Sequence, residues 1–528
     1  MIAIYGFFRT KRTDENRRPP TFDSTGSNRL VFAALLLAAV LIRCIQYGNP
    51  VIQIDEQFYL LVGDRMLQGQ LPYIQFWDRK PFGLFAIYAA IRSLGGDGIL
   101  IYQLIATLVA ATTAFVVYRI ARHAAGLAGA VFSALVYLCY LSVNGGDGGQ
   151  SPVFYSLLVA IAGLSIFRAI EDRSGNSRSM IKPLLAFLLL GLALQIKYTV
   201  VFEGIYFGLF IFFTYFIRKK TLFCISSFAI LSILLAVLPT MLIAIYYWHI
   251  GHFQQFWFCN FQSILLRPAP DWSASARRLL VIAVRLVPIA IPAALAARHW
   301  RRLGPVGMFV GGWCVVSVLA VLVFGTYYDH YALPIVLPFA IMGAPVFDKL
   351  KRSLRLGRLT VPIGVMVLAA GEIYVVANTL GLRLHRGNGN GARRIAAIIR
   401  PDADRCAFVF AGDPIVYYLS GACIPTVYNF PTLFSETSDS VTLGIDWRHE
   451  LRRTLDTRPG HIVLLDRPPK GPANAEAWQM VREELRRHYI LVDREKLASR
   501  TDLLFARRDL LRPNPPQRSK PTGPARAR

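Results

Sequence analysis

Residues 30–47 read LVFAALLLAAVLIRCIQY, an apolar run that contains a single charged residue, Arg43. A helix of about 20 apolar residues is long enough to cross the hydrocarbon core of a bilayer. Basic side chains precede this run, and no small-residue cleavage site follows it. The run therefore predicts a retained signal anchor whose N-terminal flank stays in the cytoplasm.

Further apolar runs of similar length continue along the chain. They cover residues 99–118, 124–143, 152–170, 183–198, 200–217, 222–248, 278–297, 305–326, 330–347 and 359–380. With the first run they predict an all-α polytopic membrane domain of about eleven transmembrane helices. The shorter run 81–94 is interrupted by Arg92 and is expected to form an interfacial helix.

The connections between these runs predict their orientation. Basic residues cluster in alternate connections, at 119–122, 168–182, 218–220, 298–302 and 349–358. Because cytoplasmic loops retain lysine and arginine, these connections are expected on the cytoplasmic side. The C-terminal region then lies outside, in the periplasm if the membrane is a bacterial inner membrane.

The composition supports a membrane protein and excludes one large soluble core. Hydrophobic residues make up 54% of the chain and charged residues 17%, with a formal net charge of +26, whereas soluble domains average about 25% charged residues. In a soluble protein such a charge would suggest nucleic acid. Here the topology of basic loops explains it, and no nucleic-acid partner is expected.

Four parts of the chain are expected. Residues 1–29 form a cytoplasmic basic segment, 30–383 the transmembrane domain with its first outer loop at 48–98, 384–512 a small outer α/β domain, and 513–528 a disordered tail. The boundary follows from the glycine-rich linker at 386–391. Segments 406–411 and 460–465 are expected to be buried strands, and 475–488 an amphipathic helix. Cys406 and Cys423 could pair in an oxidising compartment, but their spacing does not decide this.

The first outer connection carries the most chemistry. Asp55 and Glu56 follow the first span, and Arg79 and Lys80 follow in the same connection. Adjacent carboxylates are unusual at a membrane surface, because desolvation penalises their charged form. One interpretation is a general base with nearby cations that hold an anionic substrate. The other is a solvated loop with helix-capping acids, and composition alone does not separate the two.

Other outer connections offer weaker candidates. Asp147 lies among glycines in residues 143–150, where a plain flexible turn is the simpler interpretation. Lys197, at the end of the fifth span, could extend to the headgroups or reach a lipid phosphate. His249 and His252 have no third ligand at a fitting spacing, so no metal is predicted.

The aromatic turn 325–334 fits an interfacial belt by default, or alternatively a surface on which a sugar stacks. The ionisable residues nearest the span centres, Glu203 and Glu372, lie toward span ends. Transporters usually keep such groups at the midplane. The pattern therefore favours chemistry at the outer membrane surface over passage through the membrane.

Several motifs together resemble a known family. They are Asp55-Glu56-x-x-Tyr59, Gly69-x-Leu-Pro-Tyr73, Phe76-Trp-Asp-Arg-Lys-Pro81, Gly191-Leu-Ala-Leu-Gln-Ile-Lys197, His330-Tyr-Ala-Leu-Pro334 and Asp413-Pro-x-x-x-Tyr-x-Leu-Ser-Gly421. In this order they resemble the lipid-linked-sugar glycosyltransferases of the GT-C fold, namely the protein-O-mannosyltransferase, aminoarabinose-transferase and galacturonosyltransferase-like group. The chain departs from the family pattern at Phe82, where a second proline is usual, and in the glycines around Asp147.

The resemblance implies an inverting transfer of a sugar from a polyprenyl-phosphate donor to an acceptor hydroxyl. It implies Asp55 as general base and Glu56 as the residue that orients Asp55 or the sugar. The remaining implied roles are donor-phosphate binding by Arg79, Lys80, Lys197 and Arg267, and a substrate pocket lined by Tyr59, Asp147, His330 and Tyr331. The resemblance implies no cofactor and no metal.

The expected partners are the lipid-linked donor, membrane lipid, and an acceptor on an envelope glycan, lipid or protein. Two alternatives remain open at this point. A lipid-carrier flippase or other transporter would need paired charges within its spans. A non-catalytic scaffold of the same fold would not need Asp55.

Overall fold

The structure is a computed structural model, which shows two compact units made of residues 1–389 and 390–528. Their division falls inside the linker at 386–391. The described residues are 25–172, 181–269, 271–323, 325–348, 353–356, 359–468 and 472–511. Most of the predicted basic N-terminal segment and the predicted tail 513–528 lie outside these ranges.

Every run that was predicted to span the membrane contains a helix of the first unit. These helices are α2 (Thr25–Arg43), α5 (Gly98–Ala121), α6 (Leu127–Val143), α7 (Ser151–Glu171), α8 (Ile181–Leu194), α9 (Val201–Ile217), α10 (Leu222–His249), α13 (Trp272–Arg301), α14 (Pro305–Leu322), α15 (Leu333–Asp348) and α16 (Ile363–Arg386). Among the described residues, nine helices are long and apolar enough to cross a membrane, and α6 and α8 are apolar but shorter. The chain is a multi-pass membrane protein.

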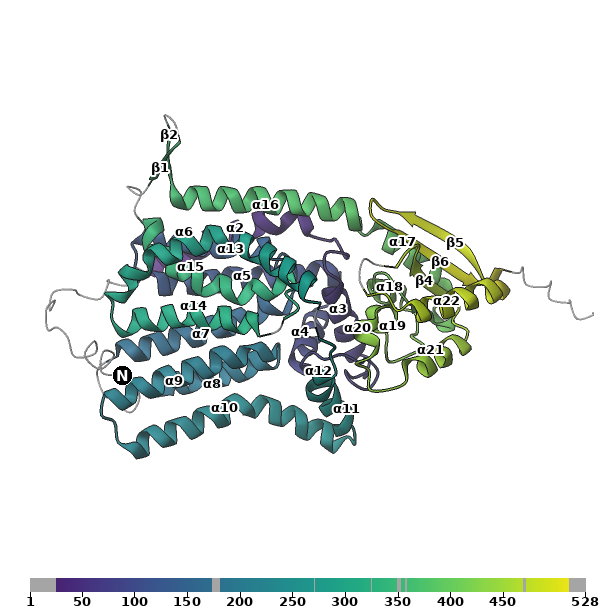
Figure 1. Ribbon diagram of the computed structural model, residues 1–528, viewed down its shortest axis with the longest axis horizontal. Coiled ribbons are helices and arrows are strands. Elements are labelled where there is room, and N and C mark those ends of the chain that lie inside the picture. The colour runs from purple at the N-terminus through teal and green to yellow at the C-terminus, as the bar shows by residue number, and fades with distance from the viewer. Residues whose placement is uncertain are drawn as a thin grey trace, which may run out of the picture. The chain divides into compact units, whose positions relative to one another are not determined.

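The helices of the first unit pack side by side, with α15 against α6, α13 and α14, and with α8 between α7 and α10 (Figure 1). In α15, 13 of 16 residues are buried, whereas in α10 only 5 of 28 are. Small residues allow the close contacts, as at Gly129 of α6, where a Cβ would lie 2.6 Å from the carbonyl oxygen of Ala344 in α15. The core of this unit therefore surrounds α15, and α10 exposes its apolar surface.

Short elements gather at one end of this helix bundle (Figure 1). They are α3 (Ile54–Met66), α4 (Phe82–Arg92), α11 (Phe253–Trp257), the π-helical turn η4 (Phe258–Gln262) and α12 (Ser263–Leu265). α4 corresponds to the helix predicted at 81–94. All connections predicted to lie outside reach this end, because α2, α6, α8, α10 and α14 run toward it.

Four connections of the first unit contain further regular structure. The 3₁₀ turns η1 (Cys44–Gln46), η3 (Tyr198–Val200) and η5 (Asp329–Ala332) adjoin α2, α9 and α15. The basic connection predicted at 349–358 contributes β1 (Ser353–Leu356), which pairs antiparallel with β2 (Leu359–Pro362). This hairpin was not predicted.

The second unit is an α/β domain, as predicted. Its sheet has the order β3-β4-β6-β5, with β3 (Ala407–Val409) parallel to β4 (His461–Leu465), and with β6 (Thr501–Arg507) antiparallel to both β4 and β5 (Tyr489–Lys496). The main helices are α17 (Asn390–Ile399), α18 (Ile415–Ser420), α21 (Trp447–Asp456) and α22 (Ala475–His488), with short turns η6 (Arg400–Arg405), α19 (Thr432–Ser435), α20 (Thr437–Ser440) and η7 (Arg508–Leu511). β4 is buried along its whole length, as its apolar sequence predicts.

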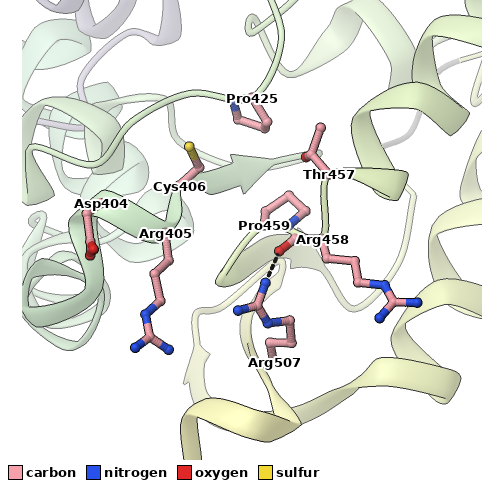
Figure 2. Close-up of a pocket in the computed structure, with 8 residues that line it drawn as sticks. All are labelled: Asp404, Arg405, Cys406, Pro425, Thr457, Arg458, Pro459 and Arg507. Carbon is pink, nitrogen blue, oxygen red and sulfur yellow. Dashed lines mark hydrogen bonds between the residues drawn. The ribbon is translucent and has the colours of Figure 1, made fainter.

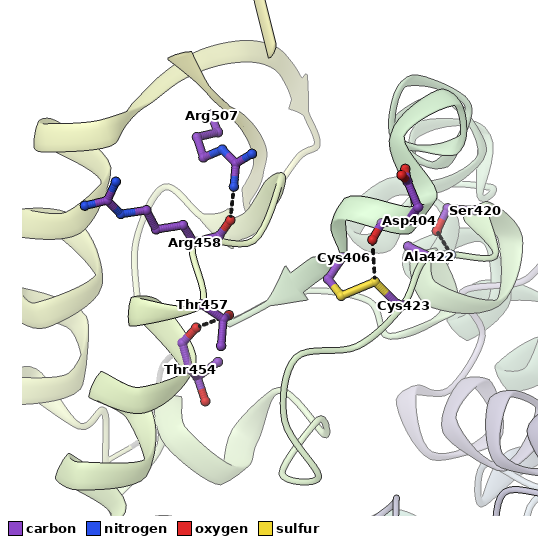
Figure 3. The surroundings of a disulfide bond; sticks show 9 residues. All are labelled: Asp404, Cys406, Ser420, Ala422, Cys423, Thr454, Thr457, Arg458 and Arg507. Atoms are coloured by element: carbon purple, nitrogen blue, oxygen red, sulfur yellow. Dashed lines mark hydrogen bonds between the residues drawn. A yellow bond between two sulfur atoms is a disulfide. The ribbon is translucent and has the colours of Figure 1, made fainter. Parts of the chain in front are cut away.

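Cys406 and Cys423, whose pairing the sequence left open, form a disulfide in this second unit (Figure 3). The backbone reinforces the link, because the amide of Ala407 donates to the carbonyl of Cys423 at 3.0 Å. Five other cysteines are free thiols: Cys44, Cys139, Cys224, Cys259 and Cys314. The disulfide ties the start of β3 to the segment that follows α18.

Candidate active site

Asp55 and Glu56 lie in the first turn of α3, which begins at Ile54. The N-terminus of a helix favours negative charge, because its backbone N–H groups have no intrahelical acceptors. Successive residues of an α-helix point about 100° apart. The two carboxylates therefore reach different surroundings, although they are neighbours in sequence.

Asp55 forms an ion pair with Lys80, from the loop that precedes α4. The distance from Lys80 Nζ to Asp55 Oδ1 is 3.1 Å, and Asp78 Oδ2 lies 3.5 Å from the same nitrogen. Asp78 also accepts a hydrogen bond from the backbone amide of Lys80 at 2.8 Å, which fixes the loop. The side chains of Lys80 and Asp55 are 31% and 21% exposed, so the pair remains accessible.

This pairing keeps Asp55 ionised. Burial alone would raise the pKa of Asp55, but the charge of Lys80 outweighs it and lowers the pKa below its usual value. Burial likewise opposes the charge of Lys80, yet Asp55 and Asp78 raise the pKa of the lysine. An unprotonated aspartate that solvent can reach has the protonation state a general base requires.

Four other predicted residues surround this pair, directly or through one another. His330 and Lys197 both act electrostatically on Asp55. Lys197 Nζ lies 4.6 Å from the ring centroid of Tyr331, and Tyr331 forms a side-chain hydrogen bond with Arg267. Burial lowers the pKa of Lys197. The structure thus brings together residues from several outer connections, which form the acid–cation cluster: Asp55, Lys80, Lys197, Arg267, His330 and Tyr331.

Glu56 lies outside this cluster. It is fully buried, and its Oε2 atom accepts a hydrogen bond from the Tyr102 hydroxyl at 3.2 Å. Burial raises its pKa from 4.5 to about 8, against a backbone hydrogen bond from Gly149 that lowers it. Glu56 therefore lies beneath the surface that Asp55 and Lys80 share, and its implied role of orienting Asp55 or the sugar stays a prediction.

Asp147 is also buried, and Gln46 Nε2 donates to its Oδ2 at 3.2 Å. Burial raises the pKa of Asp147. In the same network, the guanidinium of Arg43 donates to the carbonyl of Gly146. Asp147 is thus held between the end of the first span and its own glycine-rich loop, and it does not line an open pocket.

Two more predicted residues have contacts of another kind. Tyr59 is 1% exposed, and its ring lies under Lys80, with 5.2 Å between Nζ and the ring centroid. Arg79 stacks over the indole of Trp77, with its Cζ 4.9 Å from the ring centroid. Tyr59 therefore supports the ammonium from beneath, and Arg79 packs against its own loop.

We expect Glu56→Gln to change how the stability of the protein depends on pH. With a folded pKa near 8 and a usual value of 4.5, Glu56 keeps its proton in the folded state after the unfolded chain has released it. Its contribution to stability is therefore complete below pH 4.5 and is lost as the pH rises through about 8. Melting temperatures in detergent should fall with pH over this window more steeply for wild type than for Glu56→Gln. Parallel curves would contradict the assignment.

We expect Gly148→Ala to destabilise the protein by about 1–3 kcal/mol. A Cβ at this position would lie 2.6 Å from Cδ of Glu56 and still closer to its Oε2. Because the carboxylate is fully buried, it has little room to move. Gly204→Ala in α9 is the control, since a Cβ there has no neighbour within 4 Å. Equal melting temperatures for the two variants would show that the backbone around Gly148 shifts to accommodate the added Cβ.

Metal ligands do not cluster in the described ranges, where no group of three or more His, Cys, Asp or Glu side chains could hold a metal ion. His249 ends α10 and His252 precedes α11. The acid–cation cluster itself contains a carboxylate, two amino groups, a guanidinium, an imidazole and a phenol.

The second unit contains a pocket of about 310 Å³ (Figure 2). Its lining residues are Asp404, Arg405, Cys406, Pro425, Thr457, Arg458, Pro459 and Arg507. Arg405 lies 3.8 Å from Asp402, and Arg507 lies 2.7 Å from Asp509. Since these guanidinium groups already have carboxylate partners, the pocket is a weaker candidate for anion binding than the acid–cation cluster.

Comparisons with known proteins agree with the predicted fold. Residues 79–248 match the family described as dolichyl-phosphate-mannose-protein mannosyltransferase. No curated protein matches the chain by sequence. Among solved structures, ArnT from Cupriavidus metallidurans bound to undecaprenyl phosphate is similar, with 14% identity, a TM-score of 0.58, and coverage of 91% of this chain and 98% of that one.

A second solved structure has a weaker likeness. It is an oligosaccharyltransferase from Archaeoglobus fulgidus tethered to an acceptor peptide, with 12% identity and a TM-score of 0.50. The match covers 83% of this chain and 69% of that one. At these identities the likeness establishes the fold, which is the predicted GT-C fold.

Proposed function

We propose that the chain is a membrane glycosyltransferase of the GT-C type, which transfers a sugar from a polyprenyl-phosphate carrier to an acceptor hydroxyl. The observation that carries this proposal is the ion pair of Asp55 with Lys80, 3.1 Å long, within a group of cations. A base and several cations at one end of a helix bundle suit a reaction at the headgroup level of the membrane.

In the proposed reaction, Asp55 accepts the proton of the acceptor hydroxyl as that oxygen attacks the anomeric carbon of the donor. The bond from this carbon to the phosphate oxygen breaks from the opposite side, which inverts the configuration, and the polyprenyl phosphate leaves. Because the leaving group is an anion, it requires cations more than a proton. Lys80, Lys197 and Arg267 are the proposed cations.

The ion pair also suggests how donor binding prepares the base. A donor phosphate would compete with Asp55 for Lys80, whose ammonium has three donor protons. A weaker contact with Lys80 would make Asp55 a stronger base when the donor is bound. His330 and Tyr331 belong to η5, which is far from α3 in sequence. They are proposed to contact the sugar.

The carrier is proposed from chemistry and from a structural neighbour. Undecaprenyl phosphate is bound in the structure of ArnT from Cupriavidus metallidurans, whose fold this chain shares. The acceptor is proposed to be a hydroxyl of an envelope glycan, lipid or protein. Each of these offers the neutral nucleophile that Asp55 would deprotonate.

We propose that the reaction takes place on the outer face of a bacterial inner membrane. The basic connections are expected on the cytoplasmic side, opposite the acid–cation cluster. The Cys406–Cys423 disulfide is typical of an oxidising compartment. Thiol labelling of intact cells with a membrane-impermeant reagent, after mild reduction, should modify Cys406 and Cys423. If Cys406 and Cys423 are labelled only after lysis, the second unit lies in the cytoplasm, and the proposed orientation is wrong.

The function is tested by incubating membranes that contain the protein with a radiolabelled pool of polyprenyl-phosphate sugars. Transfer of label from the carrier to a water-soluble or glycolipid product supports the proposal, provided that membranes without the protein do not produce it. If label only crosses the bilayer of proteoliposomes while it stays on its carrier, the protein is a flippase instead.

A further inference from the structure

The segment between α10 and α13 contains a local irregularity in its helix. α11 (Phe253–Trp257) continues into the π-helical turn η4 (Phe258–Gln262) and then into α12 (Ser263–Leu265). π-helical turns are rare, and they frequently occur at functional sites. This turn contains Asn260, which is 1% exposed.

Asn260 lies between two tyrosines from distant parts of the chain. Its Oδ1 atom accepts a hydrogen bond from the Tyr198 hydroxyl at 2.7 Å, and the Tyr73 hydroxyl lies 3.2 Å from the same oxygen. Its Nδ2 group donates to the carbonyl of Phe256 at 2.8 Å. This last bond fixes the orientation of the amide, so that its oxygen faces the tyrosines.

Each tyrosine is linked to the backbone of one of the two lysines of the acid–cation cluster. Tyr198 is the residue after Lys197. The Tyr73 hydroxyl lies 2.7 Å from the carbonyl of Lys80, close enough to donate to it. We call residues 67–81, between α3 and α4, the Lys80 loop. Asn260 therefore connects the backbone of this loop with the turn that follows Lys197.

The Lys80 loop is held in a strained conformation that requires such support. Tyr73 has φ +67°, which a residue with a large side chain rarely adopts. Its ring packs against Phe256 and Tyr247, with centroid distances of 5.8 and 5.4 Å. Tyr247 also donates to the carbonyl of Pro72 at 2.9 Å. Tyr247 of α10 and the segment around Asn260 therefore hold this loop together, through ring contacts and hydrogen bonds.

The opposite face of the same segment is apolar and exposed. Trp257, Ile264 and Leu265 are 44%, 40% and 83% exposed. In a membrane protein, such side chains next to the end of a span are stable against lipid. The segment is therefore anchored on one face and bound to the site on the other.

We propose that Asn260 is a positioning residue that sets the separation of Lys80 and Lys197 for the phosphate of the lipid carrier. The inference rests on the proposed function, because it assigns the two lysines to one phosphate. An error of about 1 Å in the position of such groups can cost about 10²-fold in rate. Asn260 touches neither the phosphate nor the sugar and acts through Tyr73 and Tyr198.

The test measures the binding of undecaprenyl phosphate, and of undecaprenol without phosphate, to the purified full-length protein in detergent. Asn260→Ala and Tyr198→Phe should each weaken undecaprenyl phosphate binding about tenfold, the effect of one or two lost hydrogen bonds. Undecaprenol binding should stay within about twofold, because it does not use the lysines. The double variant should lose less free energy of undecaprenyl phosphate binding than the two single variants lose together.

Ser263→Ala is the matched control. Ser263 is fully buried in the same segment, and its hydroxyl donates to the carbonyl of Cys259 at 2.8 Å. This variant should bind undecaprenyl phosphate as wild type does. Tyr198→Phe removes only a hydroxyl, so it carries the test if Asn260→Ala does not fold.

Two results would overturn the inference. If Asn260→Ala and Tyr198→Phe bind undecaprenyl phosphate as wild type does, or weaken both ligands equally, Asn260 does not position the lysines, and the proposed function stands. If wild type itself does not prefer undecaprenyl phosphate to undecaprenol, the assignment of the lysines to a carrier phosphate fails, and this inference fails with it.

Discussion

Asp55→Asn is expected to lower the rate of sugar transfer by about 10²–10⁴-fold, the usual contribution of a general base. An amide has nearly the shape of the carboxylate but cannot accept the acceptor's proton. Lys80 would also lose its main countercharge, 3.1 Å away. The measurement is kcat/KM with membranes or purified protein, normalised to the amount of folded protein.

Asp64→Asn is the control for this substitution. Asp64 lies on the same helix, α3, its side chain is 21% exposed like that of Asp55, and it forms an ion pair with Arg92 at 2.9 Å. It differs in having no contact with Lys80. Transfer by Asp64→Asn should stay within about twofold of wild type. Comparable activity of Asp55→Asn and wild type would exclude Asp55 as the base.

Lys80→Met is expected to lower kcat/KM by about 10²–10³-fold, the usual effect of removing one stabilising donor. It should also change the pH dependence. Lys80 holds the pKa of Asp55 below its usual value, and burial acts in the opposite direction. Without the lysine the pKa rises, so Asp55 becomes protonated and inactive at a higher pH. The acidic limb of kcat/KM should therefore move toward neutral pH.

Lys80→Arg separates the two effects of this lysine. It retains the positive charge beside Asp55, so the acidic limb should remain close to that of wild type. Its planar guanidinium does not reproduce the geometry of an ammonium, and a loss of rate is still expected. If the acidic limb of Lys80→Met coincides with that of wild type, Lys80 does not control the ionisation of Asp55 during the reaction.

The long apolar helices of the first unit could be predicted because each of them is encoded locally, whereas α3, α11 and α12 were not predicted. A long apolar run is stable across a bilayer only as a helix, since no water is present to satisfy its backbone groups. The strand 461–465 and the helix 475–488 were equally clear from pattern. The hairpin of β1 and β2 was not, because each of its strands has only 4 residues and β2 falls inside the apolar run 359–380 that was assigned to a membrane span.

The composition of the site was predictable, but its contacts were not. Asp55 and Lys80 share one connection, and charge alone marks them as candidates. Glu56 is also a charged residue of this connection, so the sequence marks it as a candidate as well. Only the geometry of α3 places its side chain in the buried network with Tyr102. The glycine-rich sequence around Asp147 favoured a plain flexible turn, and the resemblance implied a place in the substrate pocket. Neither reveals that Asp147 bonds to Gln46 and that Arg43 bonds to the carbonyl of Gly146 beside it.

Asn260 illustrates the limit most clearly. Its partners Tyr73 and Tyr198 are 187 and 62 residues away in sequence. No local pattern marks the π-helical turn that carries it, and an asparagine in an aromatic loop has no distinctive signal. Contacts of this kind depend on how the helices pack, which a single sequence does not encode in any one stretch.

The ion pair of Asp55 and Lys80 also has a consequence for biogenesis. The partners are 25 residues apart in the same outer connection. In the proposed orientation, the nascent chain carries acid and countercharge across the membrane together, and Lys197, Arg267 and His330 follow later in the chain. The later cations then join a carboxylate that is already compensated, so insertion of the first spans does not have to wait for the rest of the site.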